Sequence, residues 1–193
     1  MLTAEGCRAR RQRLLDQLQP AHSLVLADPT HLRYLANFHV EGLSSSADFG
    51  GLLVIRPDGH ATLYHDNKIP KGAEPHADAR TAVHWYDGQS AATAPRRLVL
   101  RPVLEANGGR VHDCICDPLS PQVIGAISEM RRRKDPDEVA LLKTCMKACD
   151  AGHAWGRANI RPGMTELEAY AGVANAVYAA LGQFAVVYGD FTV

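Results

Sequence analysis

Four of the five cysteines occur in two close pairs, Cys114 with Cys116 and Cys145 with Cys149. Four thiolates can hold a structural zinc ion, but one residue between Cys114 and Cys116 is a shorter spacing than such sites use. The second pair lies on the apolar stripe of a predicted helix. We therefore interpret all four as small buried apolar residues rather than as metal ligands.

Histidines form two further combinations that could do chemistry. His39 and Glu41 have the His-x-Glu spacing of zinc deaminases, but the Pro-Cys-x-x-Cys segment that supplies their other ligands is absent from the sequence. His153 follows Cys149 on the same predicted helical stripe and has no other carboxylate or thiol partner at ligand spacing. We interpret His153 as a structural histidine near the end of a helix.

Acidic residues gather at two points, Asp135 with Asp137 and Glu138, and Glu166 with Glu168. Each group falls in the first turn of a predicted helix, where free N–H groups and the helix dipole stabilise negative charge. Capping therefore explains both groups. The sequence also lacks a glycine-rich phosphate loop and a Gly-x-Ser-x-Gly turn, so nucleotide binding and serine-based hydrolysis have no support.

The composition is that of an ordinary globular chain: 193 residues, 46% hydrophobic and 22% charged. The 21 Lys+Arg balance the 21 Asp+Glu, so the net charge is 0. Because binding through phosphates needs a positive surplus, we expect no nucleic-acid partner. No stretch reaches the roughly 20 apolar residues that span a bilayer, so we expect no membrane partner and a cytoplasmic location.

The first part of the chain alternates strand and helix patterns, which is typical of an α/β domain. Asp28 and Pro29 fit the N-cap and the first position of a helix. Pro57-Asp58-Gly59 separates two apolar runs and predicts a hairpin, because its glycine tolerates a positive φ. The expected elements are a helix over 3–18, a strand over 23–27, a helix from 29, a hairpin over 52–65, a strand over 83–86, a helical stretch over 91–106, a strand over 110–115 and a helix from 120.

A run of arginines lies in the first predicted helix: Arg8, Arg10, Arg11 and Arg13. Cysteine and leucine residues at 7, 14, 15 and 18 form the apolar stripe of that helix, which leaves the arginines largely to other faces. We interpret the basic run as a solvated face rather than as a nucleic-acid-binding arm.

The strongest helix signal follows a charged connector over 129–134. Asp135 is the predicted N-cap, Pro136 is the first helical residue, and Glu138 stands in the position of a capping-box acid. Apolar or small residues then recur at 139, 142, 146, 149 and 153. This spacing predicts one face of a helix that runs to about residue 159.

A second helix is predicted from Thr165, with Glu168 in the capping-box position, to Gly182. Residues 184–188 have the β-branched and aromatic character of a strand. A strand left on an open sheet edge is an aggregation liability that complete domains avoid. We therefore expect residues 126–193 to be the first part of a larger fold.

Several of these segments together resemble the creatinase, prolidase and aminopeptidase P family, whose members share a "pita-bread" fold. The resemblance is carried by MRRRKDPDEVALLKTCMKACDAG, ANIRPGMTELEAYAGVANAVYAALG, RRQRLLDQL, SLVLA and THLRYLANF, and it covers the whole chain. One departure is Asn37, which stands where the family commonly has glycine. The resemblance implies an α/β chain with a creatinase-type N-terminal domain over 1–128, a mixed central sheet and flanking helices. Residues 129–193 would be the first helices and strand of an incomplete α+β pita-bread domain.

Full-length members of this family are two-domain metallopeptidases that cleave the bond between an N-terminal residue and proline. The resemblance implies two divalent metal ions, manganese, cobalt or zinc, held by two Asp, one His and two Glu, which would activate a bridging water. In the family all five ligands follow the strand expected at 184–188. We therefore expect this chain to hold no catalytic residue, metal ligand or cofactor, and to be inactive alone; Asp190 precedes the first ligand position and is interpreted as a loop acid.

The resemblance also implies partners. In the family, one segment approaches the active site of a neighbouring subunit, and here it would contain His31, Tyr34, Phe38 and His39. We predict that Tyr34, Phe38 and His39 face substrate. The expected partners are a peptide substrate in the intact parent and a second copy of the chain in a dimer. The alternative is a non-catalytic binding or dimerisation module of the same fold. A third option, an unrelated α/β small-molecule binder, is disfavoured by the missing phosphate loop.

Overall fold

A computed structural model describes residues 1–39, 51–67, 74–85, 98–114, 116–183 and 185–188. The chain divides into two compact units, Met1–Asp135 and Pro136–Val193, and each is described by itself. The domain boundary predicted at 128/129 falls inside helix α4 (Ser120–Arg132). Residues 129–132, which we predicted as a charged connector, are therefore the last turn of that helix. Asp190 lies outside the described residues.

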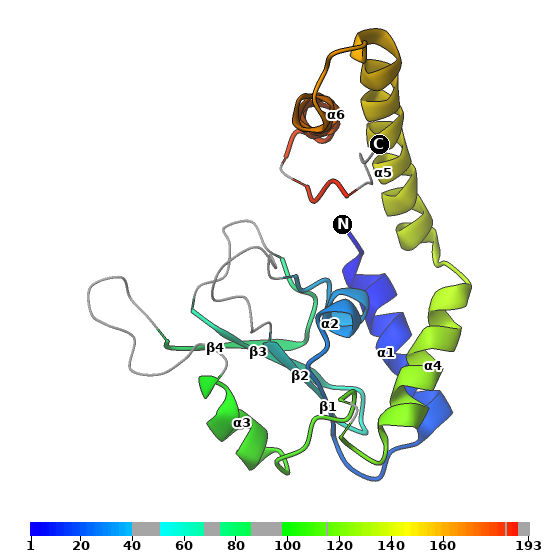
Figure 1. The fold of residues 1–193 in the computed structure, drawn as a ribbon. Coiled ribbons are helices and arrows are strands. Elements are labelled where there is room, and N and C mark those ends of the chain that lie inside the picture. Colours follow the sequence, from blue (N-terminus) through cyan, green and yellow to red (C-terminus); the bar gives the residue numbers. More distant parts are fainter. Residues whose placement is uncertain (40–50, 68–73, 86–97, 115, 184, 189–193) are drawn as a thin grey trace. The chain divides into compact units, whose positions relative to one another are not determined.

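The first unit is built on a four-stranded mixed sheet (Figure 1). Its strands, in the order β1-β2-β3-β4, are β1 (Leu24–Leu26), β2 (Gly51–Ile55), β3 (Ala61–Asp66) and β4 (Ala79–Val83). The first three strands pair antiparallel and β4 pairs parallel with β3. The predicted mixed sheet and the hairpin over 52–65 are thus confirmed.

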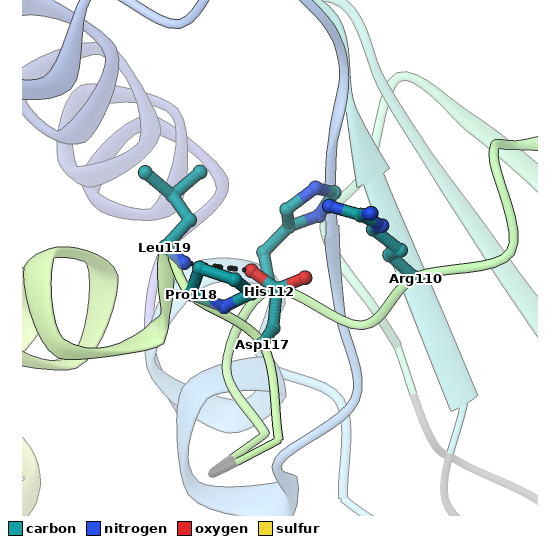
Figure 2. Close-up of a pocket in the computed structure, with 5 residues that line it drawn as sticks. All are labelled: Arg110, His112, Asp117, Pro118 and Leu119. Carbon is teal, nitrogen blue, oxygen red and sulfur yellow. Dashed lines mark hydrogen bonds between the residues drawn. The ribbon is translucent and has the colours of Figure 1, made fainter.

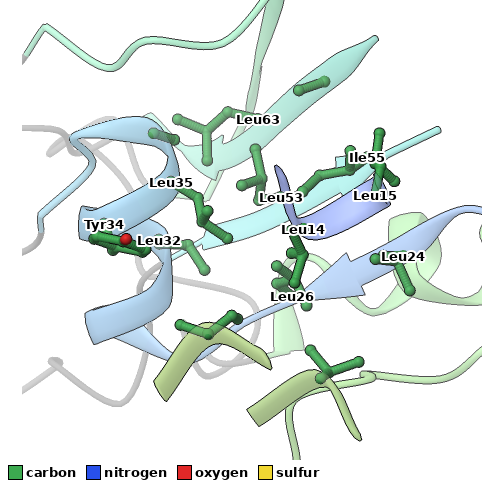
Figure 3. Close-up of a cluster of buried hydrophobic side chains, with 14 of the residues drawn as sticks. Leu14, Leu15, Leu24, Leu26, Leu32, Tyr34, Leu35, Leu53, Ile55 and Leu63 are labelled. Carbon is green, nitrogen blue, oxygen red and sulfur yellow. The ribbon is translucent and has the colours of Figure 1, made fainter. Parts of the chain in front are cut away.

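Helices cover both faces of this sheet. On one face α1 (Ala4–Leu18), α2 (Pro29–Ala36) and α4 pack their leucines, isoleucine and valine onto inward-facing residues of β1, β2 and β3, and Figure 3 shows this core. On the other face α3 (Arg101–Ala106) covers a smaller cluster that includes Val25, Leu52 and Val54. Strand residues therefore alternate between two apolar layers, as expected of a sheet buried on both sides.

The caps and the turn of the first unit form as their residue types predict. The Thr3 hydroxyl accepts a hydrogen bond from the Gly6 N–H at the start of α1, and the Asp28 carboxylate accepts from the first turn of α2. Gly59 has φ +89° in the hairpin turn. Asn37, at the end of α2, is left-handed with φ 49°. Asparagine is one of the few residues other than glycine that tolerate this conformation at the end of a helix.

Three predicted segments differ from the structure. Residues 110–114 form no strand, and residue 115 lies outside the description. The His112 N–H donates to the Val25 carbonyl, but the Val25 N–H donates to the His112 ring instead of to backbone. The strand predicted at 83–86 overlaps the structure at one residue only, because β4 ends at Val83. Of the helical stretch predicted over 91–106, the described part is helical only in α3, which carries Pro102 in its first turn. Residues 86–97 lie outside the description.

The second unit is a helical pair, α5 (Pro136–Asn159) and α6 (Glu166–Leu181). A capping box between Thr165 and Glu168 begins α6, and Gly182 ends it with φ 68°, both as predicted. Gly172 allows the two helices to approach each other closely. A Cβ on Gly172 would lie 1.9 Å from the Trp155 ring, so a side chain there would displace the indole.

The strand predicted at 184–188 is not present in the described residues 185–188. These residues have an irregular backbone, and the Tyr170 hydroxyl donates a hydrogen bond to the Val187 carbonyl at 3.2 Å. A strand needs a neighbouring strand to satisfy its N–H and C=O groups, and the described part of the second unit offers none. Within the described residues, no helix is both long and apolar enough to cross a bilayer.

Candidate functional site

The three residues predicted to face substrate lie at the end of α2 and just after it. The side chains of Tyr34 and Phe38 are buried in the core of the first unit, whereas His39 is exposed. The structure thus brings Tyr34 and Phe38 into one cluster and leaves only His39 open to solvent within the chain. Their role toward substrate stays a prediction.

Phe38 stacks on His65, a buried histidine at the end of β3 that we did not single out from the sequence. The two ring centroids are 6.0 Å apart with an interplanar angle of 26°. Gly51 makes this stack possible, because a Cβ there would lie 2.9 Å from the Phe38 ring. The His65 Nδ1–H donates to the Asp66 carbonyl at 2.6 Å, and Nε2 is buried without a partner in the described structure.

Burial lowers the pKa of His65 below its ordinary value, because a proton on Nε2 would have no acceptor. The neutral ring therefore contributes stability that is present above about pH 6.5 and is lost as the pH falls through the folded pKa. We expect urea stability to fall between about pH 7.5 and about pH 5, and we expect His65→Phe, which keeps a ring on Phe38, to weaken that fall. The exposed His22→Phe is the control. Equal pH profiles for all three proteins would contradict the prediction.

The arginines of α1 correct our sequence interpretation, because two of them are buried instead of solvated. Arg10 is 0% exposed and Arg11 is 2% exposed. Arg10 donates from Nε to the Tyr34 carbonyl at 2.8 Å and from Nη1 to Asp135 at 3.2 Å, and its guanidinium lies 5.0 Å from the centroid of the Tyr34 ring. The cation therefore has a hydrogen-bonded, aromatic environment that compensates for its lost hydration.

Arg11 joins three segments of the first unit. Its Nη1 donates to the carbonyls of Leu35 at 2.8 Å and His76 at 2.7 Å, and its Nη2 lies 3.5 Å from Asp78. Burial lowers the pKa of Arg11, and the Asp78 carboxylate opposes that shift. The Asp78 carboxylate also accepts from the Ala61 N–H at 2.8 Å. The basic run thus ties α1 to the end of α2 and to the edge of the sheet.

The acidic residues around the start of α5 form a carboxylate cluster. Oxygens of Asp135, Asp137 and Glu138 all lie within 4.8 Å of one another. The group does not fit a catalytic metal pair, because it has no imidazole and because Asp135 already accepts from the guanidinium groups of Arg10 and Arg13, at 3.2 and 2.5 Å. Two bound cations neutralise the carboxylate that a metal would need.

The cysteines also depart from their predicted burial. Cys114, Cys116, Cys145 and Cys149 are exposed, and only Cys7 is buried. Cys114 and Cys116 lie in surface turns before α4. In the second unit α5 packs against α6 through Ala148 and Gly152, so the predicted apolar face faces solvent, and His153 on it is exposed. Leu142 and Met146 on that face are 48% and 59% exposed.

Asp113 organises the segment that we had predicted as a strand. Its side chain is fully buried and accepts from the N–H groups of Ala27 at 2.9 Å and Asp28 at 3.0 Å. Its Oδ2 also lies 2.9 Å from the His31 Nδ1. One carboxylate therefore fixes the turn between β1 and α2, and His31 has a structural partner in its own chain.

An open pocket lies beside this segment, with a volume of about 280 Å³. Arg110, His112, Asp117, Pro118 and Leu119 line it (Figure 2). The Asp117 carboxylate accepts from the Leu119 N–H at 2.9 Å, the dashed contact in Figure 2. The Val25 N–H donates to the His112 Nδ1 at 2.9 Å. The pocket therefore combines a cation, an imidazole, an acid and two apolar side chains.

Comparison with solved structures identifies the fold. The chain is similar to the dipeptidase PepE of Mycobacterium ulcerans, with 22% identity, a TM-score of 0.56 and coverage of 92% of this chain and 49% of that one. It is similar to the prolidase of Pyrococcus horikoshii OT3, with 15% identity, a TM-score of 0.59 and coverage of 90% and 48%. A dipeptidase of Pyrococcus horikoshii OT3 gives 16% identity, a TM-score of 0.51 and coverage of 88% and 49%.

These likenesses define the class of fold: the chain has the creatinase/prolidase-like fold, in the form of the N-terminal half of such chains. It spans about half the length of the solved structures that it matches. No protein-family model and no curated protein matches the sequence. The resemblance that the sequence motifs indicated is confirmed at the level of the fold.

Proposed function

We propose that this chain forms the N-terminal half of a prolidase-like metallopeptidase, which hydrolyses the bond between an N-terminal residue and proline. The proposal rests on the structural match, which takes in about nine tenths of this chain and half of each solved peptidase chain. The described residues contribute the mixed sheet and the helical pair. The two divalent metal ions, manganese, cobalt or zinc, would be held by carboxylate and imidazole ligands outside the described residues.

The test compares two proteins on one substrate. The 193-residue chain, and the longer product of any reading frame that continues past codon 193, are purified and given alanyl-proline with manganese, with alanyl-leucine as the control peptide. We expect the longer product to hydrolyse alanyl-proline and this chain to leave both peptides intact. Turnover by this chain would overturn the inactivity proposal, and a longer product that hydrolyses neither peptide would overturn the peptidase proposal.

A second candidate function is supported by one observation, the exposed apolar face of α5. Val139, Leu142 and Met146 lie on one side of the helix and are 37%, 48% and 59% exposed. Exposed apolar patches favour association, so the chain could act as a non-catalytic dimerisation module. We expect Leu142→Glu with Met146→Glu to shift the chain toward monomer in sedimentation equilibrium. The matched control is Thr144→Glu on the same exposed helix; equal behaviour of both variants would argue against the module.

A cytoplasmic location belongs to the same proposal. Four cysteines are exposed and none of the five forms a disulfide. Free surface thiols persist where the cell keeps thiols reduced. Fractionation of the native host tests this, and recovery of the protein outside the cytoplasm would contradict it.

A further inference from the structure

The pocket lined by Arg110, His112, Asp117, Pro118 and Leu119 contains none of the residues that we predicted to face substrate. Its volume of about 280 Å³ lies just below the roughly 300–1,000 Å³ of pockets that hold drug-sized ligands. The size therefore suits a molecule of a few heavy atoms. All five lining residues belong to the first unit, so the pocket is complete within it.

Two hydrogen-bond donors line the pocket. The guanidinium of Arg110 is exposed and has no protein partner among the described residues. The tautomer of His112 follows from its neighbour: the Val25 N–H donates to Nδ1, so Nδ1 carries no proton and the neutral ring carries its proton on Nε2. The planar guanidinium of Arg110 and the imidazole N–H of His112 are groups that donate hydrogen bonds to a carboxylate.

One acceptor lines the same pocket. Asp117 is almost completely buried and uses one carboxylate oxygen to accept from the Leu119 N–H. Its second oxygen has no protein partner in the described structure, and no ion pair joins Asp117 to Arg110 there. An unneutralised carboxylate next to the donors disfavours a phosphate dianion, and Arg110 disfavours a simple cation.

We propose that this pocket binds a free α-amino acid as its zwitterion. The carboxylate of the ligand lies on Arg110 and His112, the ammonium group on Asp117, and an apolar side chain against Pro118 and Leu119. Each charge of the ligand then meets the opposite charge, and the total charge of the occupied pocket does not change. Every group named here belongs to the first unit.

Titration with three ligands of nearly equal shape tests the charge pattern. L-Leucine carries both charged groups, 4-methylpentanoate lacks the ammonium group, and 3-methylbutylamine lacks the carboxylate. We expect L-leucine to bind in calorimetry and to shift the amide signals of Arg110, His112 and Asp117, and the other two to bind at least tenfold more weakly. Equal binding of 4-methylpentanoate or of inorganic phosphate would overturn the zwitterion site in favour of a plain anion site, and no shift with L-leucine would overturn it outright.

Three variants test the assigned residues. Arg110→Gln removes the cation, Asp117→Asn removes the negative charge but keeps an oxygen for the Leu119 N–H, and His112→Asn keeps an acceptor for the Val25 N–H. We expect each to weaken L-leucine binding at least tenfold while urea stability stays within the range of the control, Arg101→Gln, whose arginine pairs with Glu105 outside the pocket. Unchanged affinity in the Arg110 and Asp117 variants would refute the assignment. The readout is binding, so it is independent of peptidase activity.

Discussion

Replacing Asp113 with alanine is expected to lower the free energy of unfolding by about 3–5 kcal/mol. The substitution leaves the N–H groups of Ala27 and Asp28 and the ring of His31 without their acceptor. Each donor left unsatisfied in a buried place costs about 1–3 kcal/mol, and the backbone pair is only partly buried, which sets the lower end of the range. Urea unfolding followed by circular dichroism measures the change.

Two further variants sharpen this test. Asp113→Asn keeps one acceptor oxygen and is expected to lose about half as much stability as the alanine variant. Asp16→Ala removes an exposed carboxylate that accepts from Gln12, and should cost less than about 0.5 kcal/mol. Hydrogen exchange adds a local readout, since the amides of Ala27 and Asp28 should lose protection first. A loss in Asp113→Ala no larger than in Asp16→Ala would show that this carboxylate does not fix the β1–α2 turn.

The second large effect is expected from Arg10→Met, which should destabilise the chain by about 2–4 kcal/mol. Methionine is long and apolar enough to occupy the same space, so the loss reports on polar contacts rather than on a cavity. The Tyr34 carbonyl loses its guanidinium donor, Asp135 loses the buried one of its guanidinium partners, and the contact with the Tyr34 ring is weakened.

Arg8→Met is the matched control, because Arg8 belongs to the same helix but its side chain is 73% exposed and lies 3.7 Å from Asp78. Exposed pairs of this kind contribute about 0–1 kcal/mol, so this variant should remain near the parent. Parent-like stability of Arg10→Met in urea would mean that the burial cost of the guanidinium cancels its contacts, as happens when apolar residues replace some buried ion pairs.

The burial of Arg10 and Arg11 could have been read from their spacing. They stand three and four residues after Cys7, and Leu14 and Leu15 continue the same progression, so both arginines lie on the apolar stripe of α1. The interpretation failed because residue type was given more weight than position. Their main acceptors are the carbonyls of Tyr34, Leu35 and His76, and backbone carbonyls carry no signal in a sequence.

Local signals gave the best predictions. The Asp28 cap, the turn at Gly59 and the capping box of Thr165 and Glu168 all depend on residues within a few positions of each other, and all three are confirmed. The segment 110–115 shows the opposite case. Its apolar residues suggested a strand, but the side chains of His112 and Asp113 take the hydrogen bonds that a neighbouring strand would have taken. Such competition depends on β1 and α2, some 85 residues away in the chain.

The candidate sites follow the same rule. Cys145 and Cys149 were predicted to be buried because one face of α5 is apolar. Which face of a helix is covered depends on what packs against it, and the small residues Ala148 and Gly152 form the contact with α6. The pocket near Arg110 has no recognisable sequence motif, because its residues are brought together only by the turns that the chain makes before α4. Residue spacing alone therefore predicts neither the covered face of α5 nor the pocket.

The contact between Arg10 and Asp135 joins residues that are 125 positions apart, the first helix of the first unit and its last residue. The two ends of this unit therefore meet. A domain with adjacent ends can be inserted into a loop of another protein, or given new termini elsewhere, with little rearrangement of its interior. In the first unit this proximity is held by α1, whose Arg10 and Arg13 both bind the carboxylate of its last residue.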